Sequence, residues 1–207
     1  MKQKNILYYI HDPMCSWCYG FKPILESLHN NLNHIIDIKY ILGGLAKDSD
    51  LSMPDSMKSQ IIQNWKRIEE TIPGTEFNYD FWVRCIAKRS TYPSCRAVIA
   101  VTKQNSKLER DMIKLIQQAY YLDAMNPSDY DVLYAISKNL DIDHGQFMND
   151  ILSSEVNNEL MSQIQFSRDL GADSFPSLYM YAENKYHPVV LDYNNADIIL
   201  EHIKSFI

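Results

Sequence analysis

The chain has no long hydrophobic run and no cluster of basic residues. None of its stretches approaches the 18 apolar residues of a membrane-spanning helix, and residues 1–5 lead into a six-residue strand-like run, not into a signal-peptide core. With 20 Lys and Arg against 26 Asp and Glu, the net charge is −6, and no basic run could follow a phosphate backbone. We therefore expect a cytoplasmic protein that binds neither nucleic acid nor a membrane.

Cysteine is scarce, with four residues in a chain of 207. So few cysteines do not form a disulfide framework, which excludes the small disulfide-stabilised domains. A zinc site would need a second cysteine pair or two histidines at ligand spacing, and neither is present, so we expect no metal. Hydrophobic residues, in contrast, make up 46% of the chain and are ample for a globular core.

Two of the cysteines, Cys15 and Cys18, stand three residues apart. They follow a strand-like run at residues 5–10 and stand at the predicted start of a helix. A helix N-terminus has unpaired N–H groups and a partial positive charge, which favour a thiolate over a thiol. Cys15 is therefore the predicted nucleophile, and Cys18, one turn later, the resolving cysteine. A purely structural disulfide is disfavoured because the loop that it would close is tiny.

Four other residues are weaker candidates. His11 and Asp12 precede the pair and could assist proton transfer, but the simpler interpretation is that Asp12 caps the coming helix and His11 lies in a loop. Cys85 and Cys95 are a candidate second redox pair, although such cysteines are more often small buried hydrophobic residues.

The whole chain predicts strand, helix and strand, then a helical block, then two strands and a helix. Residues 21–28 have helical spacing with Pro23 near the first turns, and residues 34–42 predict a buried strand parallel to the first. Helical spacing dominates residues 50–170, a hairpin with a turn at 183–185 follows, and residues 195–206 close the chain as a helix. We expect residues 1–49 and 171–207 to form one domain, with residues 50–170 as an all-helical insertion domain.

This α/β order of elements resembles the thioredoxin fold with the helical insertion of the DsbA family. The segments that match its cytosolic FrnE-type branch, the predicted dithiol–disulfide oxidoreductases, are residues 12–21, 43–45, 92–97 and 171–178. The resemblance implies that Pro176 is a cis-proline beside the thiols and that Phe175 presents its backbone to the substrate. From spacing alone, an ordinary trans proline at an edge strand would be preferred. Trp17, between the cysteines, is expected to contact substrate.

The predicted function is thiol–disulfide exchange on protein or small-molecule disulfides, with a cellular thiol as reductant. No cofactor beyond the cysteine pair is expected, and glutathione is a candidate reductant. Two alternatives stay open. Kappa-type glutathione transferases and hydroxychromene-carboxylate isomerases share the insertion fold and use glutathione, but they usually lack the second cysteine, which is present here as Cys18. A non-catalytic thioredoxin-like binding module would have no need for both thiols.

Overall fold

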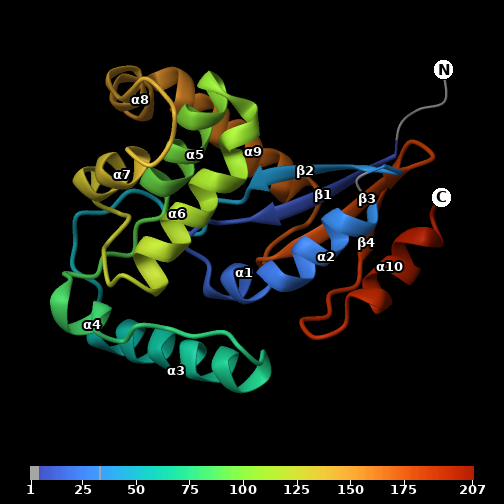
Figure 1. Ribbon diagram of the computed structural model, residues 1–207, viewed down its shortest axis with the longest axis horizontal. Helices are drawn as coiled ribbons and strands as arrows, with labels where there is room; N and C mark the ends of the chain where they lie inside the picture. The colour runs from blue at the N-terminus through green and yellow to red at the C-terminus, as the bar shows by residue number, and fades with distance from the viewer. Residues whose placement is uncertain (1–4, 33) are drawn as a thin grey trace.

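The computed structural model describes residues 5–32 and 34–207, and a four-stranded sheet lies at its centre (Figure 1). The strands are β1 (Ile6–His11), β2 (Asp37–Leu42), β3 (Ser177–Ala182) and β4 (Lys185–Val189), in the order β2-β1-β3-β4. β1 pairs parallel with β2 and antiparallel with β3, which pairs antiparallel with β4. The two ends of the chain therefore share one sheet.

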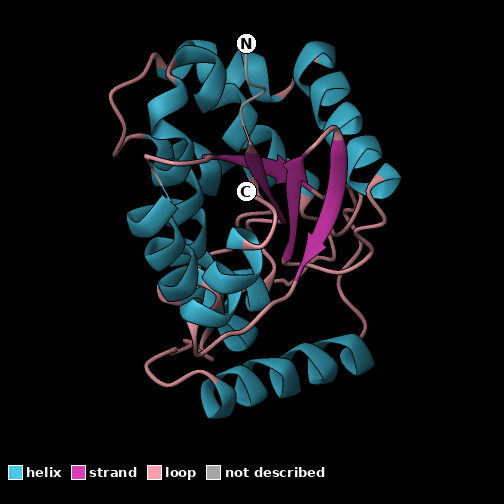
Figure 2. Ribbon diagram, turned by 90° about the vertical axis from the view of Figure 1, so that its right-hand side faces the viewer, coloured by secondary structure: helices cyan, strands magenta, loops and turns pink. Residues whose placement is uncertain are grey.

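Helices cover both faces of this sheet and extend well beyond it (Figures 1 and 2). They are α1 (Ser16–Gly20), α2 (Lys22–Leu32), α3 (Asp55–Thr71), α4 (Phe81–Arg84), α5 (Tyr92–Gln104), the 3-10 turn η1 (Ser106–Leu108), α6 (Glu109–Tyr121), α7 (Tyr130–Ser137), α8 (His144–Ile151), α9 (Ser154–Asp169) and α10 (Ala196–Lys204). Alternation along β1 sends Leu7 and Tyr9 toward α2 and α10, whereas Tyr8 contacts Phe166 of α9 with ring centroids 5.2 Å apart. The predicted α/β fold with a helical block between its two sheet segments is confirmed.

Two hydrophobic cores hold the molecule together. One lies between the sheet, α2 and α10, and includes Leu28, Met180 and Ile199. The other fills the helical block, yet it also contains Met14 and Leu42 from the first segment of the chain. The helical block thus packs directly on the end of the sheet, and the exact division at residues 49/50 and 170/171 stays a prediction.

The structure corrects some local predictions. β2 is not a fully buried strand, because it lies at an edge of the sheet and most of its residues are half-buried. The hairpin turn has two residues, Glu183 and Asn184, both with positive φ, and Lys185 already belongs to β4. Pro23 lies in the first turn of α2, as predicted. Over the described ranges 5–32 and 34–207, no helix combines the length and apolar character needed to cross a membrane.

Candidate active site

The cysteine pair lies where β1 ends and α1 begins, next to the helical block (Figure 1). Cys15 is the N-cap residue of α1, and its N–H donates to the carbonyl of Asp12 at 3.0 Å. Cys18 lies within α1. Both thiols are free, and 6% of Cys15 but only 1% of Cys18 is exposed. The predicted nucleophile is thus the more accessible of the two sulfurs.

Burial separates the two thiols chemically. It raises the pKa of the Cys18 thiol well above its usual value, and the hydrogen bond and charge of Cys15 raise it further. Three tyrosines, Tyr9, Tyr121 and Tyr193, lie close enough for the charge of the thiols to add to the effect of burial on their own pKa values. Cys18 is therefore a protonated thiol in an aromatic, water-poor environment.

The loop before β3 lies directly against Cys15. The Phe175–Pro176 peptide bond is cis, in the position where the resemblance places a cis-proline. The Sγ of Cys15 donates to the carbonyl oxygen of Phe175 at 3.4 Å. The Phe175 ring packs on Gly43 so closely that a Cβ at that glycine would overlap it. The structure thus brings Cys15, Phe175 and Pro176 together, while their contact with substrate stays a prediction.

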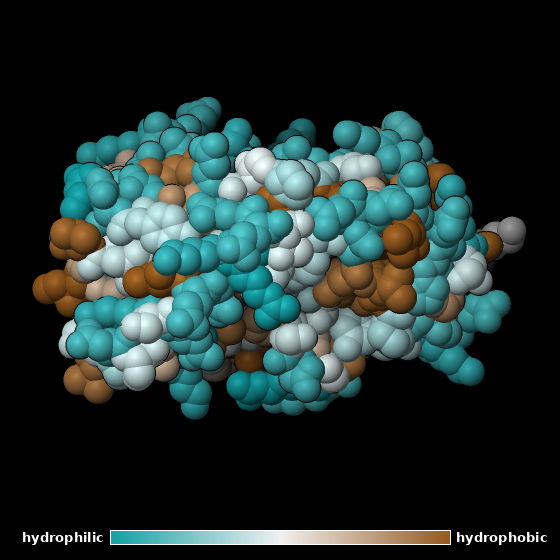
Figure 3. Space-filling model, turned by 90° about the horizontal axis from the view of Figure 1, so that it is seen from below, coloured by the Kyte–Doolittle hydropathy of each residue, from teal (hydrophilic) through white to brown (hydrophobic). Residues whose placement is uncertain are grey.

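A groove of about 330 Å³, which we call the Cys15 groove, opens beside this sulfur. Its walls are Cys15 and Trp17, the loop residues Ser174 and Phe175, and the facing side of α3. Trp17 is half-buried, with its ring 5.1 Å from that of Tyr193 and under the guanidinium of Arg67 at 5.9 Å. Figure 3 shows the side of the molecule on which α3 lies, and hydrophilic side chains cover most of it. Trp17 therefore lies at the edge of the Cys15 groove, and its contact with substrate stays a prediction.

Arg89 also lines the Cys15 groove, and sequence reasoning missed it. This side chain is half-buried, and within the described part of the chain its guanidinium has neither a hydrogen bond nor an ion pair. Its charge acts on Tyr120, whose pKa it lowers against the larger opposite effect of burial. Nothing in the local sequence around Arg89 indicates a site, because its position depends on the packing of the helical block against α1.

Asp12 does not cap α1, so that interpretation is wrong. Its fully buried carboxylate accepts hydrogen bonds from the Met14 N–H at 2.8 Å, the Leu45 N–H at 2.7 Å, the Thr91 hydroxyl at 2.6 Å and the Cys95 thiol at 3.5 Å. Burial raises the pKa of Asp12, and these hydrogen bonds lower it in part. The carboxylate therefore ties the active-site loop to the helical block.

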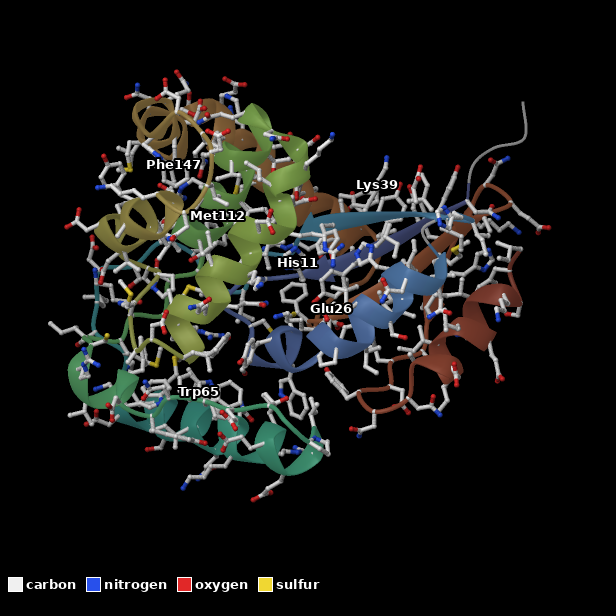
Figure 4. The ribbon with its side chains drawn as sticks, in the orientation of Figure 1. His11, Glu26, Lys39, Trp65, Met112 and Phe147 are labelled. Atoms are coloured by element: carbon white, nitrogen blue, oxygen red, sulfur yellow. The ribbon has the colours of Figure 1, made fainter. Side chains whose placement is uncertain are left out.

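His11 is not a loop residue either. It is the last residue of β1, is 1% exposed, stacks on Tyr9 at 5.0 Å and has Tyr40 edge-on at 5.5 Å. Neither ring nitrogen has a hydrogen-bond partner in the described residues. Burial lowers the pKa of His11 to about 3, so the imidazole is neutral near pH 7. Figure 4 shows His11 in the interior between the sheet and the helical block.

The structure gives Cys85 and Cys95 separate partners. Cys85 follows α4 and donates to the carbonyl of Ala124 at 3.1 Å, whereas Cys95 lies in α5 and contacts Asp12. All four cysteines of the chain are free, those of the Cys15–Cys18 pair included, and a second redox pair of Cys85 and Cys95 stays a prediction. Leaving aside residues 1–4 and 33, no group of three or more His, Cys, Asp and Glu side chains could hold a metal ion.

Comparisons with known proteins fit this geometry. A structure from Nitrosomonas europaea described as a "putative protein disulfide isomerase" has a TM-score of 0.87 at 22% identity, over 98% of this chain and 97% of that chain. The cytosolic disulfide reductase DsbM from Pseudomonas aeruginosa, which has also been solved with GSH, has a TM-score of 0.77 at 20% identity over 97% of each chain. These identities show a shared fold.

The matches to curated relatives cover most of this chain but a smaller share of the relatives' own length. The ClpXP adapter protein SpxH of Halalkalibacterium halodurans is 22% identical over 182 residues, which are 86% of this chain and 59% of that protein. The chain therefore spans less than two thirds of the curated relatives that it matches. The family model described as Thioredoxin, however, matches residues 8–200. The chain thus belongs to the thioredoxin family and has its DsbA-type fold with a helical insertion, in agreement with the FrnE-type resemblance of its motifs.

Proposed function

We propose that the protein is a thiol–disulfide oxidoreductase that acts through Cys15 and Cys18. The observation that carries this proposal is the asymmetry of the pair. The Sγ of Cys15 lies at the open groove, against the backbone of Phe175, whereas Cys18 is shielded behind it. A nucleophile that meets substrate and a resolving thiol kept from solvent are what disulfide exchange through two cysteines requires.

The reaction proceeds in two exchanges. The Cys15 thiolate attacks one sulfur of a substrate disulfide, a bond forms between them, and the other substrate sulfur leaves as a thiolate. The Cys18 thiolate then attacks the Cys15 sulfur, which releases the second substrate thiol and leaves a Cys15–Cys18 disulfide. Two electrons have passed from the protein to the substrate, and an external thiol returns them.

The charge of Cys15 affects how readily Cys18 takes part in the second exchange. The charge of Cys15 is one of the causes that raise the pKa of Cys18. When Cys15 is bonded to substrate, that charge is gone, so the pKa of Cys18 falls and its thiolate becomes more accessible. Formation of the mixed disulfide therefore makes the resolving attack by Cys18 easier, although burial still raises the pKa of its thiol.

The groove favours a substrate with a carboxylate near its disulfide. Arg89 provides a positive charge beside the nucleophile that has no hydrogen bond or ion pair with any described residue, and guanidinium groups pair well with carboxylates. A GSH-bound form of the similar reductase DsbM supports a glutathione-type disulfide or a glutathionylated protein as substrate, and glutathione as reductant. The setting that we propose for this reaction is the reducing cytoplasm.

A Cys18→Ser variant tests the function directly. With a disulfide substrate it should accumulate a mixed disulfide at Cys15, visible by mass spectrometry without reduction, and lose turnover. Cys15→Ser should form no adduct. A glutathione-dependent transferase or isomerase would instead keep its turnover in Cys18→Ser. Equilibration against glutathione would then give the direction, because reductases of this kind lie near about −270 mV and oxidants near about −120 mV.

A second candidate is a protein-binding adapter, in line with the binding module that the sequence left open. Seven curated relatives match significantly and are named ClpXP adapter protein SpxH. Binding to purified ClpXP by a Cys15→Ser/Cys18→Ser double variant separates the two candidates. An adapter would bind as tightly without its thiols, whereas an oxidoreductase that meets its partners through mixed disulfides would not.

A further inference from the structure

A second cavity, of about 400 Å³, lies on the other side of the thiol pair, and we call it the Cys18 cavity. It is bounded by α2, η1 and α6, and Tyr9 of β1 and Tyr40 of β2 face it from the sheet. Cys18 contributes to its wall, and it shares no lining residue with the Cys15 groove. Its position between the sheet and the helical block is typical of ligand sites.

The rim of the Cys18 cavity is positively charged. Lys22, Lys107, Arg110 and Lys114 give four positive charges, and Glu26 and Asp111 give two negative ones, so the local balance is +2 in a chain whose net charge is −6. Figure 4 shows Glu26 on α2. Within residues 5–32 and 34–207, none of the four cations forms an ion pair. Their charge is therefore available to an anion.

Gln117 adds a hydrogen-bonding group to the wall of the Cys18 cavity. This side chain lines the Cys18 cavity, is only 6% exposed, and its amide has no hydrogen bond to any described residue. The amide is not among the fully buried polar atoms without a partner, so it faces the cavity, where the oxygen of a ligand can replace the water that it otherwise meets. Helical spacing places Gln117 below Arg110 and Lys114 on the same face of α6. The amide and the two cations thus point to one binding site.

The wall below the charged rim is aromatic and aliphatic. Tyr9, Leu25, Tyr40 and Ile113 form it. The Tyr40 hydroxyl is already engaged with the Nε2 of His29 at 2.8 Å, so this part of the wall offers mainly apolar surface. A ligand that suits the whole cavity has charged groups at one end and a short carbon body at the other.

We propose that the Cys18 cavity binds a small organic dianion, a phosphate ester or a dicarboxylate. Its charged groups pair with Arg110, Lys114 and Lys22, and an oxygen accepts a hydrogen bond from the Gln117 amide. Because Cys18 lines the cavity, the ligand lies beside the thiol pair without occupying the Cys15 groove. It binds at a place separate from the disulfide substrate.

Isothermal titration at low ionic strength tests this site, with 3-phosphoglycerate, glycerol 3-phosphate and succinate as probes. At least one probe should bind the wild-type chain with a stoichiometry of one. Arg110→Gln/Lys114→Gln should weaken that binding by about tenfold or more, since two charges adjacent to the anion are lost. Lys204→Gln/Lys185→Gln removes two exposed charges elsewhere, on α10 and β4, and should leave the affinity unchanged.

Gln117→Leu gives a variant that keeps the fold, because the wild-type amide has no hydrogen bond to lose within the described structure. It should weaken the binding of the same probe by about threefold or more, with an unchanged melting temperature or a higher one. If no probe binds saturably, or if the Arg110/Lys114 and Lys204/Lys185 double variants bind alike, the proposal is overturned.

Discussion

The two sides of the thiol pair differ in shape and in charge. On one side, the Cys15 groove of about 330 Å³ is formed by α3 and the loop at Phe175, and Arg89 carries a positive charge in it. On the other, the Cys18 cavity of about 400 Å³ has four cations and two anions at its rim. Two cysteines only one helical turn apart therefore line two different cavities.

This difference arises from the elements packed around α1 and not from α1 itself. Cys15 and Cys18 belong to one short segment, and the local sequence treats them almost alike. Tyr9 and Tyr193 lie near both thiols, but only 1% of Cys18 is exposed, whereas the sulfur of Cys15 meets the carbonyl of Phe175 at the groove. The packing around α1, more than the motif, thus makes the two cysteines different, and the roles that we propose for them follow from this difference.

Thiol reactivity should show the largest difference between the two sides. In the reduced protein at pH 7, iodoacetamide should modify Cys15 at least about 1000-fold faster than Cys18, because the thiolate is the reactive form and burial raises the pKa of Cys18 well above its usual value. Peptide mass spectrometry of the single variants Cys15→Ser and Cys18→Ser measures the two rates separately. Cys95, which is equally buried, serves as the slow reference. Rates within tenfold of each other would contradict the asymmetry.

Asp12 holds the loop on which that asymmetry depends. Asp12→Asn should lower the free energy of unfolding by about 3 kcal/mol, since an amide N–H would then face the buried donors of Leu45 and Thr91. Urea unfolding measures the change. Thr91→Val, which removes one of the four donors, is the matched control and should cost about 1 kcal/mol. A loss below that of the control would show that Asp12 does not tie the loop to the helical block.

The parts of this site that follow from local sequence could be predicted. The strand before Cys15, the helix after it and the later Phe175–Pro176 segment each have their own signal in pattern or resemblance. Such signals depend on neighbours a few residues apart, and they placed Cys15 and Cys18 at the start of a helix and Pro176 after a cis bond. They did not show that β2 is an edge strand, because an edge is defined only by the other strands.

The parts that depend on distant contacts could not be predicted. Asp12 was interpreted as a helix cap because a capping residue has the same local signature, yet its partners Leu45, Thr91 and Cys95 come from far along the chain. Arg89 lies in a segment that by itself indicates only a short helix or a loop. Its role is visible only when the helical block is packed against α1.

His11 provides a test on the side of the Cys18 cavity, because it packs against Tyr9 and Tyr40 of the cavity wall. Its pKa is lowered from 6.5 to about 3 by burial, so between these values the unfolded chain binds a proton that the folded chain does not. Its contribution to stability is therefore complete above pH 6.5 and is lost as the pH falls toward 3. Between pH 8 and pH 5 this residue alone should cost about 2 kcal/mol of stability.

Urea unfolding of His11→Phe at both pH values isolates this contribution. The variant should lose about 2 kcal/mol less than the wild type on going from pH 8 to pH 5, because Phe has no proton to bind. His187→Phe, at a histidine of β4 that stacks on Phe206, is the control and should follow the wild type. If His11→Phe and the wild type showed equal pH dependence, the folded chain would bind a proton at His11 as readily as the unfolded chain does, and burial would not lower the pKa of this residue.

Arg89 provides a test on the side of the Cys15 groove, where we expect a smaller change, in substrate affinity. Arg89→Gln should raise KM for glutathione disulfide about tenfold with little change in kcat, because it removes a charge that pairs with the substrate and not with the thiols. Hydroxyethyl disulfide has no carboxylate, so the Arg89→Gln variant should reduce it as efficiently as the wild type does. Arg84→Gln removes an exposed charge on α4 outside the groove and should leave both substrates unaffected. If Arg89→Gln slowed the reduction of both disulfides equally, the guanidinium would act on the fold or on Cys15. Recognition of a carboxylate would then have to come from another side chain of the groove.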